Sequence, residues 1–366
     1  MNLKEIPKLK VGNFEIRVPI IQGGMSVGIS LSGLASAVAN EGGVGVIGTA
    51  GIGMLEPDYN TNFKEANKRA LRKEIRKARE MTDGIIGVNI MVALSDFDDL
   101  AMIALDGKAD LIFIGAGLPL RYSKALLRDS AGEVLTKIIP IVSSVKATKI
   151  IFQYWARKYN HVPSALVVEG PLAGGHLGFK KEQIDNPNYA LDKILKEVIS
   201  AIKPFEDQFN KQIPVIAAGG IYTGADIYKF IQLGAQGVQM ATRFVATHEC
   251  DASIKFKDSY VKCKKENIAI IDSPVGLPGR AIRNKFLEDV SAGAKIPFKC
   301  PWKCLKTCDF KKAPYCINLA LTNAKKGKLE EGFVFAGVNA YRINKIVSVK
   351  ELIETLLKEY EEAVSE

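Results

Sequence analysis

Short apolar runs recur along the first 245 residues, each followed by a glycine or polar turn and then by a stretch with helical spacing. Eight of these runs are expected to be strands, over residues 19–22, 44–48, 85–90, 110–114, 138–142, 165–168, 214–217 and 237–240. None alternates strictly between apolar and polar residues, which is typical of strands buried on both faces. The helical stretches between them indicate parallel pairing.

Those intervening stretches have the spacing of amphipathic helices. They cover residues 32–40, 63–81, 96–105, 145–158, 190–202 and 225–233, and a further helix is expected over 348–363. Eight strand–helix units in about 240 residues match a (β/α)8 barrel better than an open doubly wound sheet. The sequence therefore predicts an α/β fold, a (β/α)8 TIM barrel with a smaller Cys/Lys-rich unit near the carboxyl terminus.

The strand–helix rhythm ends near residue 245, which suggests three parts. Residues 1–245 are expected to form the barrel, and residues 246–330 a basic, cysteine-containing insert or second domain. Residues 331–366 are expected to be a carboxyl-terminal segment and helix that return to the barrel.

Composition is that of an ordinary globular chain, with 366 residues, 47% hydrophobic and 25% charged. This excludes disorder and collagen-like repetition. The apolar runs are far shorter than the ~20 residues needed to cross a bilayer. The opening stretch MNLKEIPKLKVG has no apolar segment behind its charges. We therefore expect no secretory signal, no membrane anchor and a cytoplasmic protein.

The net charge of +10 is concentrated in one window. Residues 295–328 hold nine lysines against a single acid, Asp309, which accounts for +8 of that charge. The window contains no arginine, so a nucleic-acid surface is not expected. It could instead stabilise an anionic cluster or dock an acidic redox or carrier protein.

Four of the six cysteines lie in the same window, with the spacing C-x3-C-x3-C-x7-C: Cys300, Cys304, Cys308 and Cys316. In a reducing cytoplasm such clustering favours metal binding or redox chemistry over disulfides. On one helix the first three sulfurs would be separated by about 6 Å of rise, whereas tetrahedral zinc needs sulfurs ~3.8 Å apart. A helical segment would therefore favour an iron–sulfur cluster. Pro301 and Pro314 argue against a continuous helix, so zinc and free thiols remain alternatives.

The loops after the carboxyl ends of the predicted strands are rich in glycine, and active sites of this fold lie there. Phosphate-binding barrels use the loops after strands seven and eight, where backbone N–H groups reach the oxygens. Here these loops are Gly219–Gly220 and Gln239–Thr242. The alternative is that both glycines only make a tight turn.

His176 follows a predicted strand in a loop flanked by Gly174, Gly175 and Gly178. Its position at a strand's carboxyl end and a side-chain pKa near neutrality favour acid–base catalysis over a structural role. His161 precedes a strand at the opposite rim, and His248 lies in a polar segment. Both are expected to be ordinary surface residues.

With these motifs in place, the sequence resembles the nitronate monooxygenase family, formerly the 2-nitropropane dioxygenases, and the related flavin-containing enoyl-acyl-carrier-protein reductases of the second type. The resemblance runs from Val18 to about Phe286. It rests on VPIIQGGM, NEGGVGVIG, GVNIMV, AGGHLG, IPVIAAGGI, LGAQGVQMATRF and GRAIRNKF.

The resemblance implies noncovalent FMN across the barrel mouth. It places the loop Gln22, Gly23, Gly24 and Met25 against the flavin, with Asn89 and Glu169 bonded to the isoalloxazine or ribityl part and Gly174 and Gly175 adjoining it. Gly219, Gly220, Gln239, Met240, Ala241 and Thr242 would hold the phosphate, and His176 would be the base or proton donor.

The motifs do not separate the two activities. QGGM and Glu169 lean towards the reductases, while GLPGRAIRNKF looks more like the monooxygenases. Leu172 stands where family members usually carry Glu. The tail motif FVFAGVNA resembles a segment that the reductases place near the active site, so residues 335–340 are expected near the barrel mouth.

The sequence thus predicts an FMN-dependent oxidation of alkyl nitronates by O2. The alternative is reduction of an enoyl thioester with NAD(P)H, or another NAD(P)H:flavin reaction. A non-redox phosphate-binding barrel is the remote alternative. The sequence indicates neither the substrate nor the oligomeric state.

Overall fold

The computed structural model describes residues 6–121, 136–296 and 298–366. Within them, eight parallel strands close into a barrel in the order β3, β4, β5, β6, β7, β8, β10 and β11. These strands span Ile20–Gln22, Val44–Gly48, Ile85–Met91, Leu111–Gly115, Lys137–Val142, Leu166–Glu169, Val215–Ala218 and Gly237–Met240. The predicted (β/α)8 barrel is confirmed, and each strand end lies within one residue of its predicted place.

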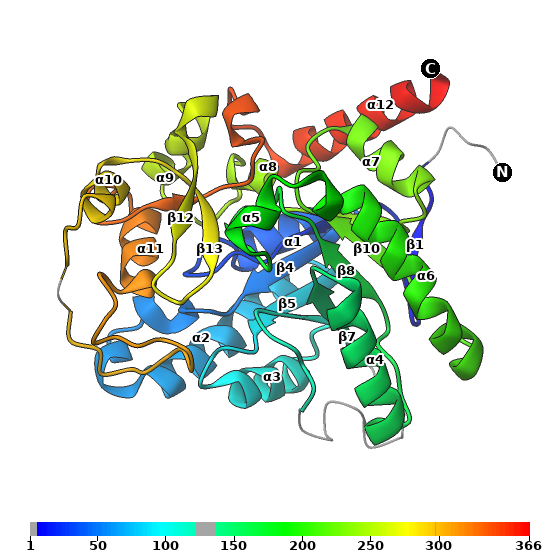
Figure 1. The fold of residues 1–366 in the computed structure, drawn as a ribbon, viewed down its shortest axis with the longest axis horizontal. Coiled ribbons are helices and arrows are strands. Elements are labelled where there is room, and N and C mark those ends of the chain that lie inside the picture. Colours follow the sequence, from blue (N-terminus) through cyan, green and yellow to red (C-terminus); the bar gives the residue numbers. More distant parts are fainter. Residues whose placement is uncertain (1–5, 122–135, 297) are drawn as a thin grey trace.

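Helices surround the barrel, as Figure 1 shows. Those predicted are observed as α1 (Ser32–Asn40), α2 (Tyr59–Met81), α3 (Phe97–Asp106), α4 (Val145–Tyr159), α6 (Leu191–Phe209), α7 (Gly224–Gln232) and α12 (Val349–Ser365). Helix α6 runs beyond its predicted end and contains Pro204, because Phe205 and Phe209 continue its apolar face against the core. Helix α12 packs against α7 and α1.

Shorter elements, which the sequence analysis did not predict, complete the chain. They are η1 (Ile52–Leu55), α5 (Lys181–Ile184), η3 (Pro187–Tyr189), α8 (Thr242–Val245), α9 (Ile254–Val261), η4 (Lys265–Asn267), α10 (Lys285–Ser291), α11 (Ile317–Lys325) and η5 (Ala340–Arg342).

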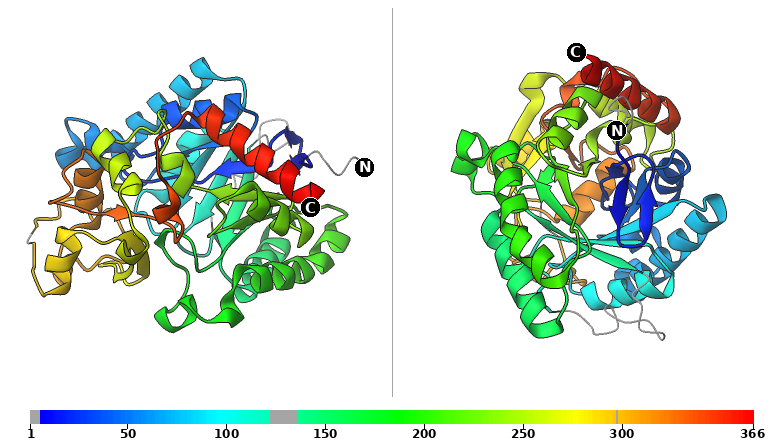
Figure 2. Two further views of the ribbon diagram at one scale, coloured as in Figure 1. Left: turned by 90° about the horizontal axis from the view of Figure 1, so that it is seen from above. Right: turned by 90° about the vertical axis from the view of Figure 1, so that its right-hand side faces the viewer.

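An amino-terminal hairpin closes the end of the barrel at which its strands begin. Strands β1 (Leu9–Val11) and β2 (Phe14–Ile16) pair in antiparallel fashion. Leu9, Val11 and Ile16 are fully buried and join the cluster of side chains that fills the barrel interior. The two views of Figure 2 place this hairpin at the end of the molecule opposite the sheet described next. Within the described residues, this hairpin therefore blocks the end of the barrel at which its strands begin.

A second sheet lies over the other end of the barrel. Strands β12 (Ile268–Asp272), β13 (Pro278–Ile282) and β14 (Val334–Phe335) pair in antiparallel fashion, and the two-residue strand β9 (Gly175–His176) also pairs with β13. In Figure 1, β12 and β13 lie beside α10 and α11, away from the hairpin. The chain beyond residue 245 thus covers the end of the barrel where active sites of this fold lie.

The basic, cysteine-bearing part shares one hydrophobic cluster with the barrel helices. Trp302, Leu305, Tyr315 and Phe333 belong to the same cluster as the side chains of α1 to α4. The division at residues 245 and 330 therefore stays a prediction, since continuous packing of this kind sets no boundary of its own.

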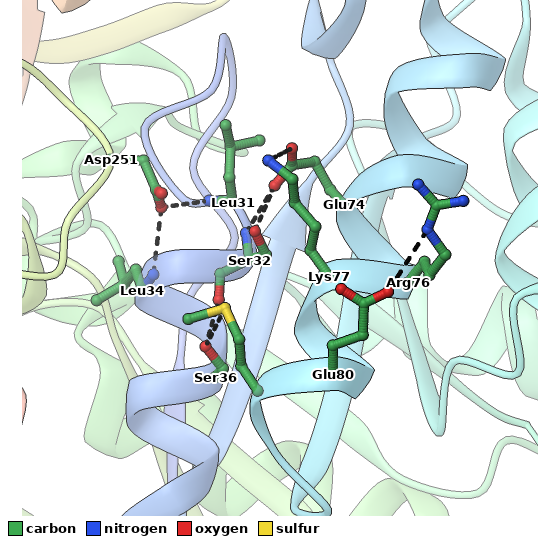
Figure 3. A network of polar contacts seen from close by, with 10 residues as sticks. Leu31, Ser32, Leu34, Ser36, Glu74, Arg76, Lys77, Glu80 and Asp251 are labelled. Atoms are coloured by element: carbon green, nitrogen blue, oxygen red, sulfur yellow. Dashed lines mark hydrogen bonds and ion pairs between the residues drawn. The ribbon is translucent and has the colours of Figure 1, made fainter.

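A network of polar contacts ties this later part to α1 (Figure 3). One carboxylate oxygen of Asp251 accepts hydrogen bonds from the Leu31 and Leu34 amides, at 2.8 and 3.2 Å. Glu74 of α2 accepts from both the amide and the hydroxyl of Ser32. The amide groups that begin α1 are thus satisfied by two carboxylates from distant parts of the chain.

Among the helices that the structure describes, none is both long enough and apolar enough to span a membrane. Residues 1–5, on which the expectation of no leader partly rests, lie outside the described chain.

Candidate active site

Loops after β8, β10 and β11 meet a carboxyl-terminal segment at the end of the barrel where its strands finish. The amide of Gly170 donates to the Ala218 carbonyl at 2.9 Å. The amide of Gly337 donates to the Thr242 hydroxyl at 3.1 Å, and the Asn339 amide group donates to the Gly220 carbonyl at 2.7 Å. These contacts place residues of the tail motif directly on the two predicted phosphate loops.

Gly219 and Gly220 form a turn that requires glycine. Their φ angles are +95° and +85°, a region that L side chains rarely adopt. A Cβ atom on Gly219 would lie 2.8 Å from the Gly170 carbonyl oxygen, and one on Gly220 would lie 2.8 Å from Leu172 Cβ. The backbone at this turn is therefore bare of side chains, as a cradle for a phosphate group needs to be.

The loop that follows β3 lies beside the same site. The amide of Gly23 donates to the Met240 carbonyl at 2.8 Å. A Cβ on Gly24 would lie 2.4 Å from the Cβ of Asn89, so only glycine allows this loop to approach β5 so closely. The predicted flavin contacts of β3, β5 and β11 thus come together in the fold.

Gln22 is the exception among these side chains. It is fully buried, its Nε2 donates to the Gly23 carbonyl at 2.5 Å, and its Oε1 accepts from the Val46 amide at 2.9 Å. Both ends of the side-chain amide are occupied inside the protein. Its place against the flavin stays a prediction. In the structure, its two hydrogen bonds hold the loop after β3 in place.

His176 lies in β9, opposite Gly279 of β13. The glycine-flanked segment is therefore paired in a sheet, which corrects the expectation of a free loop. Its Nε2 lies 2.7 Å from the Ser273 hydroxyl, and the edge of Phe335 contacts the ring, with centroids 5.0 Å apart. Burial lowers the pKa of His176 to about 4. The imidazole is therefore neutral near pH 7, with Nδ1 lacking a hydrogen-bond partner within the described residues.

Arg280, also in β13, fixes the loop between β8 and β9. Its Nη1 donates to the carbonyls of Pro171 and Ala173, both at 2.6 Å, and the side chain is buried. Charge-assisted bonds of this kind are among the stronger ones in proteins. The residue that fixes the loop before His176 therefore comes from a strand more than a hundred residues later in the chain.

Glu169 ends β8 and is partly buried at the site. Burial raises the pKa of its carboxyl to about 7. Burial is the only cause of this shift, and within the described chain no hydrogen bond or positive neighbour lowers the pKa of Glu169 again. The Glu169 carboxyl is thus free to bond a group that is not part of the protein.

The raised pKa predicts a pH-dependent stability. Glu169 has a higher pKa folded than unfolded, so the stability it contributes is complete below about pH 4.5 and is lost as pH rises through about 7. This shift corresponds to about 3 kcal/mol at most. We expect the free energy of unfolding of flavin-free protein to fall less between pH 5 and pH 8 in Glu169→Gln than in wild type. The exposed Glu182→Gln should retain the wild-type slope, and equal slopes in all three would contradict the prediction.

The other two histidines lie away from this site. His161 follows α4 and stacks on Trp155, and burial lowers its pKa to about 4. It is therefore a packed residue rather than the surface residue that was expected. His248 receives a bond on its carbonyl from Lys257 and is exposed.

The four clustered cysteines also come together, in a second place. Cys300, Cys304, Cys308 and Cys316 line one cavity beside the loop after β5. Their segment is not helical, since Pro301 and a left-handed Lys303 (φ 46°) interrupt it. The helical spacing argument therefore does not apply. Among the described residues, no three His, Cys, Asp or Glu side chains are arranged to hold a single metal ion, so zinc gains no support.

Two functional neighbours were not predicted from the sequence. Ser273 lies in a turn sequence, DSPVG, that signals a loop but no site. Arg280 lies inside the motif GRAIRNKF, yet nothing in the residue order shows that it bonds a loop a hundred positions earlier. Only the pairing of β13 with β9 reveals both.

Comparison with known proteins agrees with this arrangement. The family model for nitronate monooxygenase matches residues 8–106 and 96–359. A probable nitronate monooxygenase of Staphylococcus aureus (strain Newman) is 27% identical over 301 residues, covering 75% of this chain and 78% of that relative.

Solved structures show the same fold over nearly the whole chain. FabK from Thermotoga maritima is 30% identical with a TM-score of 0.73, covering 96% of this chain and 94% of that chain. A nitroalkane oxidase from Streptomyces ansochromogenes has a TM-score of 0.72 at 21% identity and covers 96% of this chain and 97% of that chain. The family model spans most of the barrel and the sheet above it, and the chain belongs to the nitronate monooxygenase family.

Proposed function

We propose that this protein is an FMN-dependent oxidoreductase that oxidises alkyl nitronates with O2. The observation that carries the proposal is the pairing, at one end of the barrel, of a side-chain-free glycine turn with a buried, neutral histidine. Gly219 and Gly220 supply the turn, and His176 supplies the proton-transfer group. Family membership supports the same reaction class.

The residues present fit FMN. The bare backbone at Gly219 and Gly220 and the Thr242 residue would hold the phosphate. Glu169 and Asn89, at the ends of β8 and β5, would bond the ribityl or ring part, since the Glu169 carboxyl has no partner in the described chain. Bound FMN would supply the two-electron redox chemistry.

His176 would handle the proton. Its hydrogen bond to Ser273 and its contact with Phe335 fix the ring plane, which leaves Nδ1 to accept the α-proton of a neutral nitroalkane and so form the nitronate that is then oxidised. Because the imidazole is neutral above about pH 5, its Nδ1 is available to accept a proton across the physiological range.

A reductase is the second candidate, because FabK from Thermotoga maritima is similar over 96% of this chain. In that case NAD(P)H would be the electron donor and an enoyl thioester the acceptor. The exposed lysines of residues 295–328 would suit an acidic carrier protein. A small molecule is the substrate of either enzyme. We propose that the protein acts in the cytoplasm, where reducing conditions keep cysteines such as these six as free thiols.

One anaerobic experiment separates the two candidates. We expect purified protein to be yellow and its flavin to bleach on addition of an alkyl nitronate, but not with NADH or NADPH alone. Bleaching by pyridine nucleotide without nitronate would favour the reductase. A colourless protein that binds no added FMN would contradict both candidates. A non-redox phosphate-binding barrel would then be the remaining alternative.

A further inference from the structure

The cavity lined by the four clustered cysteines lies outside the flavin site. Cys300, Cys304, Cys308 and Cys316 all contribute to it, and its other walls are largely apolar: Phe298, Lys303, Leu305, Phe310, Ile317 and Asn318. A run of turns brings these four side chains together from 17 residues of chain. Nothing in the proposed nitronate chemistry uses them.

The four sulfurs are near neighbours but are not bonded to one another. Burial, and then the proximity of Cys316, Cys300 and Cys308, raises the pKa of Cys304 to about 12. Cys300 and Cys308 likewise raise the pKa of Cys316, after burial. All four are free thiols, with no disulfide among them. A packed quartet of thiols is the usual ligand set of a thiophilic metal centre.

Buried polar groups without a partner lie near the cysteine segment, behind the residues that line the cavity. The buried side-chain atoms that lack a hydrogen-bond partner within the described chain are the Tyr59 hydroxyl, the Ser95 hydroxyl, one oxygen of Asp96 and the Trp302 indole nitrogen. The rings of Tyr59 and Trp302 are tilted by 50° with their centroids 5.4 Å apart, and the pKa of Tyr59 is raised by burial and then by Cys304. Ser95 donates its amide to the Cys304 carbonyl at 3.0 Å.

Three of those groups are donors, and buried donors are rarely left unpaired in proteins. Their concentration beside four thiols indicates an acceptor that the side chains do not provide. Inorganic sulfide is such an acceptor, whereas a lone zinc ion is not.

Further donors already reach the thiols. The Asn318 amide group donates to Cys304 Sγ at 3.3 Å. The backbone amides of Leu319 and Asn318, at the start of α11, are hydrogen-bonded to the Cys316 sulfur. Hydrogen bonds to sulfur of this kind stabilise thiolate ligands and set the potential of iron–sulfur clusters.

Among the described residues, no three His, Cys, Asp or Glu side chains converge on one metal ion. The choice of centre therefore rests on the unpaired donors near the cysteines, because an iron–sulfur cluster carries inorganic sulfides that accept hydrogen bonds and a zinc ion carries none. We propose that Cys300, Cys304, Cys308 and Cys316 ligate a [4Fe–4S] cluster, with Tyr59, Ser95 and Trp302 bonding its sulfurs.

The proposed site is attached to the barrel at the loop after β5. Leu305 pairs with Leu94, and the Lys306 amide donates to the Ala93 carbonyl at 2.8 Å. Asn89, a proposed flavin contact, lies in β5 only a few residues earlier. A bound cluster would therefore fix the segment that covers this side of the flavin site, and it would do so whichever substrate the barrel accepts.

The test is the metal content of full-length protein purified without oxygen. We expect four irons and four acid-labile sulfides per chain, and a paramagnetic signal after reduction with dithionite that remains when FMN has been removed. One zinc per chain without sulfide would overturn the assignment. Folded protein that contains neither iron nor sulfide, even after anaerobic reconstitution, would overturn it as well.

Serine variants locate the site. Each of Cys300→Ser, Cys304→Ser, Cys308→Ser and Cys316→Ser should lose most of its iron, whereas Cys250→Ser and Cys263→Ser should retain it. Cys250 and Cys263 are matched controls because both are buried free thiols outside the cavity. Equal iron in all six variants would contradict the ligand set.

A conservative variant tests the cluster without removing a ligand. Tyr59→Phe should keep the full iron content, and the cluster's reduction potential should become more negative because one donor to its sulfur is lost. An unchanged potential would remove Tyr59 from the proposal. Failure of the nitronate assay would leave all these metal measurements unaffected, so the two proposals can fail separately.

Discussion

Replacing His176 with alanine should abolish most oxidation of a neutral nitroalkane while leaving the flavin bound. A positioned base contributes about 10²–10⁴-fold to proton transfer, and a loss of that size is expected in kcat/KM. A preformed nitronate has already lost its α-proton, so its oxidation should fall far less. The measurement is the rate of flavin bleaching under anaerobic conditions with each substrate form.

The His161→Ala variant is the control for this experiment. Like His176, His161 is partly buried, and burial lowers its pKa to about 4, but it lies beside Trp155 before the start of β8. Removing the His161 side chain should lower the stability of the protein. It should not change the ratio of the rates with nitroalkane and with preformed nitronate. Full turnover in His176→Ala would remove this residue from the mechanism. Equal losses with nitroalkane and nitronate would give it a positioning role only.

The expected pH profile follows from the same contacts. Because burial holds the pKa of His176 near 4, the base should be available at every pH above about 5. An ionisation seen near pH 7 would then belong to Glu169, whose pKa burial raises to about 7. Glu169→Gln should remove the change in rate near pH 7. Ser273→Ala should mainly change the orientation of the imidazole.

The barrel could be predicted because its strands carry their own signal. Runs such as Val44–Gly48 are buried on both faces, so every residue is small or apolar, and the helices between them repeat at a regular distance. The glycine turns at Gly219 and Gly220 are visible for a similar reason. A φ near +90° excludes other residues wherever the fold places it.

The sheet above the barrel has no such signal. Strands β9 and β14 have two residues each, and β12 is only partly buried, so no periodicity distinguishes them from loops. Their pairing is decided by contacts between distant parts of the chain, such as Gly279 with His176. The sequence therefore singles out His176 as the candidate base but does not show what holds it, since Ser273 and Arg280 reach it only through this sheet.

The cysteine quartet is an intermediate case. Its composition and spacing point to a metal centre without the fold, but the choice between centres depended on an assumed helix that does not exist. The unpaired donors of Tyr59 and Trp302 lie more than two hundred residues apart in the chain. No pattern in the sequence could have placed them beside the same cavity.

Substituting Gly219 with alanine should release the flavin. At φ +95° an alanine is strained by about 1–2 kcal/mol, and its Cβ would press against the Gly170 carbonyl at 2.8 Å. The turn must shift, which moves its backbone away from the position a phosphate needs. We expect FMN binding to weaken at least tenfold, which corresponds to about 1.4 kcal/mol. The measurement is flavin fluorescence on titration of FMN into stripped protein.

Gly293→Ala separates backbone strain from the loss of the phosphate cradle. Gly293 has almost the same φ, +96°, but a Cβ there would meet nothing within 4 Å. It lies after α10, away from the barrel mouth. Both variants should melt at a slightly lower temperature, because both force alanine into the left-handed region, but only Gly219→Ala should lose affinity for FMN. Equal affinities in the two variants would show that the cofactor phosphate binds elsewhere in the barrel.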